Sequence, residues 1–218
     1  MNINILVFNN QFPKEKAVEV FKKYEKKSRK LSLIELIYIP FWLLTFQLTI
    51  EKFSLSKLLK VHQIGSKFKP LENKINETNI KKLKIEMIAD ALLGYSAFFS
   101  HNKTDNIEPI KVEVDEIFVL KPIIEDYTTL LESIKKEIKK RIFSIHLWSI
   151  KNFNIYLENS RLVYIPFWVG YYKESNSREE KWSVEVINSL TGQAEEAWYK
   201  KIFYKAILSQ KANFTSIF

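Results

Sequence analysis

Histidines and acidic pairs are the side chains of this sequence that could carry metal or acid–base chemistry. The three histidines are His62, His101 and His146. Only His101 has a second potential ligand at helical spacing, Asp105, whereas a protein metal site usually combines three or four ligands. The sequence therefore predicts no metal site.

Four acidic pairs occur, at residues 115–116, 125–126, 179–180 and 195–196. Neighbouring side chains in a strand or helix point apart, so none of these pairs forms a hydrolase-type acid and base. There is no cysteine, and no nucleophile elbow, phosphate loop or dinucleotide fingerprint is found. We expect no catalytic residue and no cofactor. The acids at 125–126 instead suit the start of a helix, where the dipole favours negative charge.

The chain is basic, with 34 Lys and Arg against 25 Asp and Glu and a net charge of +9. One explanation is a polyanionic partner, bound through release of counterions. The other is composition, because only four of the basic residues are arginine. Two runs would lie on the outer faces of helices and form the candidate basic surface: Lys22, Lys23, Lys26, Lys27, Lys135, Lys136, Lys139, Lys140 and Arg141. Whether they form one surface depends on how the helices pack.

A seven-residue motif occurs twice, at residues 36–42 and 162–168, and the two copies differ only at their second residue. An internal duplication explains this. The aromatic residues could form a platform for bases or peptides. The interpretation we favour is structural, with proline bending a strand at an edge or bulge and both faces buried. The repeat-core residues are Tyr38, Pro40, Phe41, Trp42, Tyr164, Pro166, Phe167 and Trp168.

A strand and a helix precede each motif. Residues 2–8 and 111–120 alternate as strands do. Residues 14–30 and 125–148 carry apolar side chains at helical spacing: Ala17, Phe21 and Tyr24 in the first copy, and Leu131, Ile134, Ile138, Ile142 and Ile145 in the second.

A second strand follows each motif and ends in an Asx–Gly turn, at Asp90 and Gly94 and at Asn188 and Gly192. The unit is thus β-α-β-β. The first copy is predicted to carry a long hairpin insertion, about 53–82, with a short helix at 56–63. A helix within 193–211 is predicted to turn Trp198 and Ile202 inward.

The second copy, from its helix to the stretch Trp182-Ser-Val-Glu-Val-Ile-Asn-Ser-Leu-Thr-Gly-Gln193, resembles a PepSY-type module. Asn188 and Gln193 stand where that family usually has Asp and Glu. The resemblance implies a cystatin-like helix packed on a small antiparallel sheet. PepSY modules are typically exported and linked to peptidase regulation.

Residues 31–50 hold one charge, Glu35, and are long enough for a membrane-spanning helix after a basic flank. The second copy argues against a span, because residues 169–175 are too short and polar to cross. We therefore predict strands in both copies, with membrane contact unlikely. Residues 1–8 show no basic leader, so we expect no signal peptide and an intracellular, cytoplasmic protein.

The sequence thus predicts an α+β fold: two diverged β-α-β-β repeats with antiparallel sheets, packed as an intramolecular pseudo-dimer. The repeats would span 1–108 and 109–218. We expect a non-enzymatic binding or assembly module whose partner is a protein. The alternative is a sequence-independent nucleic-acid binder using the lysine-rich helix faces; an enzyme ranks third and a membrane-anchored protein fourth.

Overall fold

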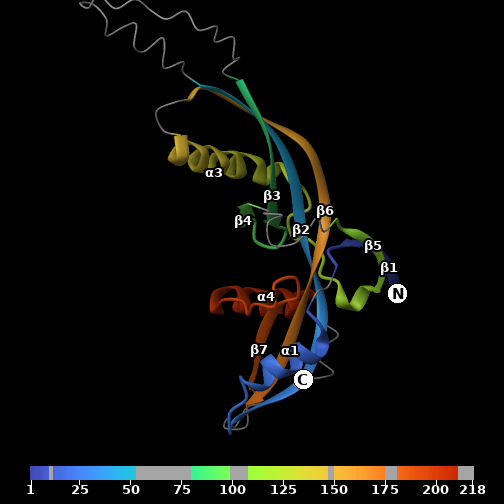
Figure 1. The fold of residues 1–218 in the computed structure, drawn as a ribbon. Helices are drawn as coiled ribbons and strands as arrows, with labels where there is room; N and C mark the ends of the chain where they lie inside the picture. Colours follow the sequence, from blue (N-terminus) through green and yellow to red (C-terminus); the bar gives the residue numbers. More distant parts are fainter. Residues whose placement is uncertain (10–11, 53–79, 99–107, 147–149, 175–180, 211–218) are drawn as a thin grey trace, which may run out of the picture.

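The computed structural model describes residues 1–9, 12–52, 80–98, 108–146, 150–174 and 181–210 (Figure 1). The fold is mixed α+β, and its described strands form one seven-stranded, mostly antiparallel sheet. The predicted fold class is confirmed at this level.

Two long strands form the backbone of the molecule. β2 (Arg29–Lys52) and β6 (Ile150–Glu174) pair antiparallel from Arg29 opposite Glu174 to Lys52 opposite Ile150. Both are rich in β-branched and aromatic residues, which favour strands. At the middle of the pair Ile39 lies opposite Ile165, so the two motifs cross each other in opposite directions.

The remaining strands flank this pair in the order β4-β3-β2-β6-β1-β5. β3 (Ile80–Asp90) pairs with β2, and β4 (Ser96–Phe98) pairs with β3. On the far side of β6 lie β7 (Lys181–Asn188) and the single pair that joins β1 (Asn2–Val7) to β6. β5 (Ile110–Asp115) pairs with β1 over its whole length and leads into η2 (Glu116–Phe118), a 3-10 helix.

Three helices of the described part of the chain cover the sheet at different heights (Figure 1). α4 (Ala197–Gln210) lies over the centre and buries Phe203, Ala206 and Ile207 against the odd-numbered residues of both motifs. α1 (Lys14–Lys22) packs on β6 and β7 at one end, and α3 (Thr128–His146) packs on β2 and β3 at the other. α1 and α3 therefore each pack on strands from the other half of the chain, whereas α4 lies across both motifs.

Sequence reasoning placed the motif prolines at a sheet edge or a bulge, but both lie in central strands, and the bulges of the β2–β6 pair fall elsewhere. The Tyr38 carbonyl accepts a hydrogen bond from Leu120 N at 3.0 Å, and the Pro40 carbonyl accepts one from Ala91 N at 3.1 Å. N–H and C=O of one strand residue point to the same side, so the nitrogen of Pro40 faces this flank and not β6. At Pro40 the neighbour of β2 changes from β3 to the segment around Leu120. No hydrogen bond between the described strands therefore requires the N–H that proline lacks.

The motif tryptophans make the same kind of contact in both copies. Trp42 Nε1 donates to the Ile124 carbonyl at 2.9 Å, and Trp168 Nε1 donates to the Phe12 carbonyl at 2.8 Å. Each indole thereby ties the segment before a helix to the strand that the helix covers. The predicted structural use of the motif agrees with this geometry.

The predicted Asx–Gly turns are confirmed. Asp90 Oδ1 accepts from Leu92 N at 2.7 Å, and Asn188 Oδ1 accepts from Leu190 N at 3.0 Å. Gly94 and Gly192 adopt φ of +77° and +69°, the left-handed region that glycine enters without strain.

The boundaries of several predicted elements were wrong. The first helix ends at Lys22 instead of residue 30, because a tight turn joins Lys26 to Arg29, where β2 begins. The strand predicted at 111–120 ends at Asp115, whose carboxylate accepts from Ile117 N and starts η2. The second helix is shorter than 125–148 and begins at Thr128, because Asp126 Oδ1 accepts from Thr128 N.

The predicted insertion is shorter than proposed, because residues 80–82 are strand residues paired with Thr49–Glu51. The rest of it, with the helix at 56–63, lies outside the described residues, as do the side chains of Ile145, Trp198 and Ile202. Residues 31–50 belong to β2, as the strand prediction required. Across the described ranges, none of the helices combines the length and apolar character that crossing a bilayer demands.

Replacing either motif tryptophan is expected to destabilise the fold. Trp42→Ala and Trp168→Ala each remove a large packed side chain and leave a carbonyl without its donor, so we expect a loss of roughly 3–5 kcal/mol in the free energy of unfolding. Urea unfolding followed by circular dichroism measures this. Tyr156→Ala in β6, where the ring is 59% exposed, is the control and should change little. Wild-type stability in either tryptophan variant contradicts the structural role.

Candidate functional site

The predicted basic residues lie at opposite ends of the long strands and do not form one surface. Lys22, at the end of α1, and Lys23, Lys26 and Lys27, in the turn that follows, are all exposed. On α3, Lys136, Lys139, Lys140 and Arg141 are exposed and Lys135 is half-buried. Figure 1 shows the two helices far apart along β2 and β6.

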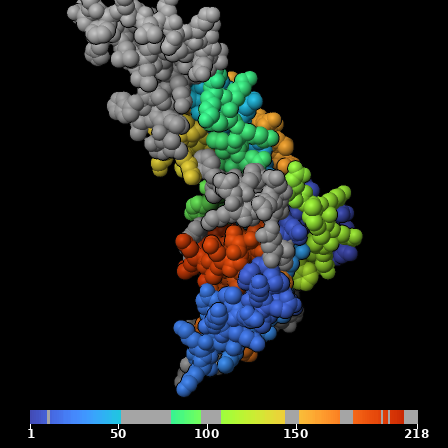
Figure 2. All heavy atoms as spheres, viewed as in Figure 1, coloured from blue at the N-terminus to red at the C-terminus, as the bar shows by residue number. Residues whose placement is uncertain are grey.

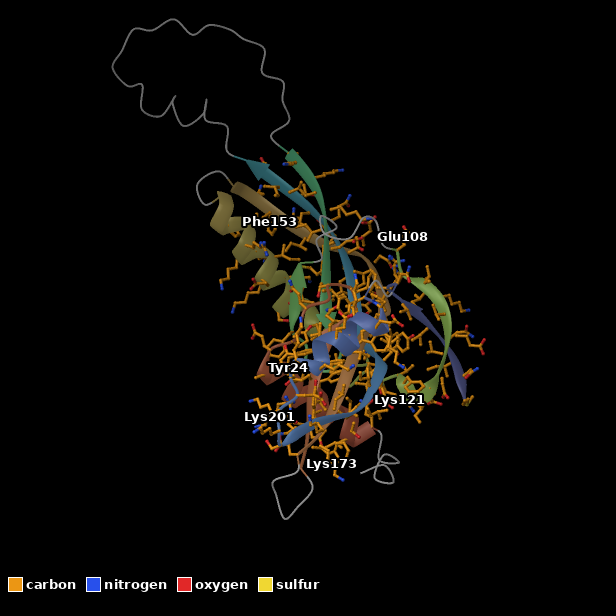
Figure 3. The ribbon with its side chains drawn as sticks, turned by 60° about the horizontal axis from the view of Figure 1, so that its bottom comes forward. Tyr24, Glu108, Lys121, Phe153, Lys173 and Lys201 are labelled. Carbon is orange, nitrogen blue, oxygen red and sulfur yellow. The ribbon has the colours of Figure 1, made fainter. Side chains whose placement is uncertain are left out.

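The end near α1 concentrates positive charge. Lys30 is exposed next to this turn and lies directly opposite Lys173, a like-charge pair that disfavours strand pairing. Figure 3 shows Tyr24, Lys173 and Lys201 in this region, far from Phe153 near the other end. We call Lys22, Lys23, Lys26, Lys27 and Lys30 the basic tip.

Acidic side chains beside the basic tip are held in internal contacts. Glu25 accepts from Leu31 N at 3.1 Å. Glu185 is 11% exposed and accepts from Arg29 at 3.0 Å and from Lys200. These two carboxylates are therefore engaged away from the lysines of the basic tip. On α3, by contrast, Lys135 pairs with Glu132 at 3.1 Å.

A buried polar cluster lies under α4. Asp90 is 3% exposed, and the Tyr199 hydroxyl interacts with its carboxylate. Burial raises the pKa of Asp90 and of Glu195, although the hydrogen bond from Leu92 N opposes the rise at Asp90. Burial and the nearby carboxylates also raise the pKa of Tyr199. The cluster joins the two Asx–Gly turns to α4, with Asp90 buried and Asn188, Glu195 and Tyr199 half-buried.

β1 and β5 form a two-stranded ribbon beside the long strands (Figure 1). Glu116 N donates to the Met1 carbonyl at 2.8 Å and extends the register in which Asn2 lies opposite Asp115. Hydrogen-bonded pairs alternate along an antiparallel ladder, so Ile110, Val112 and Val114 bond to β1. The N–H and C=O groups of Lys111 and Glu113 therefore point away from β1.

No other described strand pairs with this side of β5. Lys111 and Glu113 are exposed, as is half of Ile110, at 51%, and Figure 2 shows this yellow-green segment at the surface. Val112 and Val114 are half-buried against a small cluster that contains Ile5 and Tyr164. We call this side of β5 the open edge.

One hollow, of about 380 Å³, lies at the far end of the long strands and is lined by Thr49, Glu51, Ile80, Asn152, Phe153 and Asn154. Its single carboxylate, that of Glu51, already accepts from Asn152 Nδ2 at 2.6 Å. Among the described residues, the hollow thus offers no second titratable group for acid–base chemistry.

The predicted pair His101 and Asp105, and the side chains of His62 and His146, lie outside the described residues. Within the described ranges no three His, Asp or Glu side chains gather as metal ligands would.

Sequence reasoning named four of the five residues of the basic tip, Lys22, Lys23, Lys26 and Lys27, but left out Lys30, and it missed the open edge as a surface. Lys30 and Lys173 are distant in sequence and meet only through the β2–β6 register. Alternation at 111–115 predicted a strand, but the sequence held no sign that β5 would lie at a sheet edge. The alternating charges of Lys111 and Glu113 were the one available hint, since charged residues are common on edge strands.

Comparison of the chain with protein family models, curated proteins and solved structures finds no match. The resemblance of the second copy to PepSY-type modules stays a prediction.

Asp90→Asn is expected to stabilise the protein at alkaline pH. Asn keeps the acceptor for Leu92 N, as Asn188 does for Leu190 N, and removes a buried charge. A raised folded-state pKa gives Asp90 a stabilising contribution at low pH that is lost as pH rises through that pKa. The melting temperature of Asp90→Asn should therefore rise relative to that of wild type between pH 4 and pH 8.

Asn188→Asp is the matched control, because it places a second carboxylate beside Glu195. It should lower the melting temperature at pH 8 and have less effect at pH 4. A pH-independent difference between Asp90→Asn and wild type contradicts the assignment.

Proposed function

We propose that this protein is a non-enzymatic binding and assembly module whose partner is a protein segment that adds a strand to the open edge. The observation that carries the proposal is the direction of the Lys111 and Glu113 backbone groups, which point away from β1 on an exposed strand. An extended segment can bond to such an edge through its own main chain.

The scaffold behind this edge is proposed to be a duplicated pseudo-dimer. Three contacts that recur between the halves support this: the antiparallel crossing of the motifs at Ile39 and Ile165, the two indole bonds, and the two Asx–Gly turns. α1 and α3 cover strands of the other half and α4 lies across both motifs, so the halves are proposed to interlock and to hold the β1–β5 ribbon on a stiff support.

The two faces of β5 define the partner. Its apolar face presents Ile110, Val112 and Val114, and its polar face presents Lys111, Glu113 and Asp115. An added strand continues both faces, so the partner segment should alternate apolar, preferably β-branched, residues with charged ones.

Strand addition can be tested with synthetic peptides. We expect fluorescein-labelled peptides that alternate Val or Ile with Lys or Glu to bind saturably in an anisotropy titration. The same peptides with a central proline should bind at least about tenfold more weakly, because proline cannot donate to a ladder.

Glu113→Pro is the decisive variant, because it removes an outward N–H and leaves the β1 ladder intact. It should abolish peptide binding. Asn4→Pro is the matched control, because β1 bonds to β5 through the alternate residues, and it should retain binding. Equal binding by both variants, or none by wild type, contradicts the proposal.

The second candidate function is sequence-independent binding of nucleic acid, and the basic tip favours it. Its lysines are exposed around one turn, and the nearby carboxylates of Glu25 and Glu185 are engaged internally. Such a cluster attracts phosphates without reading bases.

This candidate predicts oligonucleotide binding that weakens steeply with salt. The triple variant Lys26→Glu/Lys27→Glu/Lys30→Glu should lose oligonucleotide binding. The triple variant Lys136→Glu/Lys139→Glu/Lys140→Glu on α3 changes the net charge by the same amount and should keep most of the binding. Anisotropy at two salt concentrations measures both variants. Equal losses would mark a general charge effect and reject the basic tip as the site.

A further inference from the structure

We infer that the strand that adds to the open edge is β5 of a second copy of this chain, antiparallel, with Lys111 of each copy opposite Glu113 of the other. This inference rests on the proposed function and names its partner. It follows from the residue pattern of β5 and from the direction of its backbone groups.

The outward-pointing residues limit the possible registers. In an antiparallel pair, the residues that bond across the new edge must be the ones whose N–H and C=O face it. In β5 these are Lys111, Glu113 and Asp115. Two copies related by a two-fold axis can therefore align only in steps of two residues.

One register places opposite charges together throughout. With the two-fold axis at Val112, Lys111 faces Glu113 of the second copy, and Glu113 faces its Lys111. Directly opposed unlike charges on a strand pair are favourable, by roughly 0.2–1 kcal/mol for each pair. Neither side chain forms an ion pair with a described residue, so both are available.

The neighbouring registers are worse. Moving the axis to Glu113 sets the two Glu113 carboxylates opposite each other and brings Lys111 opposite Asp115, whose carboxylate is already paired with the Met1 ammonium at 3.5 Å. Moving the axis to Lys111 sets two ammonium groups opposite each other. Like charges in this position are destabilising. The charge pattern thus selects the register centred on Val112 and disfavours slippage.

The apolar face is complementary in the same register. Val112 meets Val112, and Ile110 meets Val114 of the second copy. Ile110 is 51% exposed and Val112 and Val114 are half-buried. Pairing extends the apolar surface over Ile5 and Tyr164 from one copy into the next. β5 has six residues, so the contact is smaller than the roughly 1,200 Å² of a stable interface, and a dissociation constant of about 10–500 µM is expected.

Sedimentation velocity of the full chain from about 5 µM to about 1 mM tests this in that affinity range. Wild type should shift from monomer to dimer with concentration. Glu113→Lys and Lys111→Glu should each weaken dimerisation by about tenfold or more, because each replaces two unlike pairs by two like pairs. Circular dichroism of both variants verifies that each is folded.

Mixing the two single variants is the critical step. Glu113→Lys carries two lysines and Lys111→Glu carries two glutamates, so each becomes the complement of the other. An equimolar mixture should form a heterodimer while each variant alone stays monomeric. As a control, Lys136→Glu and Glu132→Lys on α3 exchange charges at a distant site. These two variants should dimerise as wild type does, alone and in the mixture.

Three results overturn the inference: a wild type that remains monomeric up to about 1 mM, single variants that dimerise like wild type, or a mixture without heterodimer. Failure of the proposed function is distinguished by the peptide titration. Suppose that wild type is monomeric but binds alternating peptides, and that Glu113→Pro abolishes this binding. Strand addition then stands, and only the second copy is rejected as the partner.

Discussion

The antiparallel pairing of β2 with β6 is the constraint on which the rest of the structure depends. Ile39 and Ile165 face each other at its centre, and both are buried. The motifs run in opposite directions through this point. For this reason the contacts made by one motif recur at the matching residues of the other motif. The flanking strands, both indole bonds and both Asx–Gly turns take their positions from this register.

The register also determines what reaches the surface. It carries α1 and α3 to opposite ends of the sheet and so divides the basic charge between two places. It brings Lys30 opposite Lys173 although they are far apart in the sequence. It joins β1 to β6 through the pair of Val7 and Tyr164, with Leu120 N bonded to the Tyr38 carbonyl on β2. β5 lies beyond β1 at the end of the strand order, where the open edge is.

Much of the local structure could be predicted from the sequence because short-range chemistry determines it. Apolar spacing indicated both helices, and Asx and Gly residues indicated both turns. The end of the first helix was wrong because the chain turns between Lys26 and Arg29, and the Arg29 side chain then bonds to Ser183 and Glu185 of a distant strand. The place of Pro40 and the edge position of β5 depend on which strands become neighbours. No local pattern encodes that choice, and the candidate site depends on it.

Amide hydrogen exchange at single-residue resolution tests the open edge most directly. The amides of Val112 and Val114 should be protected in wild type and in Glu113→Lys, because they bond to β1. The amides at 111 and 113 should exchange rapidly in the monomeric variant and become protected in concentrated wild type. Protection at 111 and 113 in the monomer would mean that the chain covers this edge itself and would contradict the account.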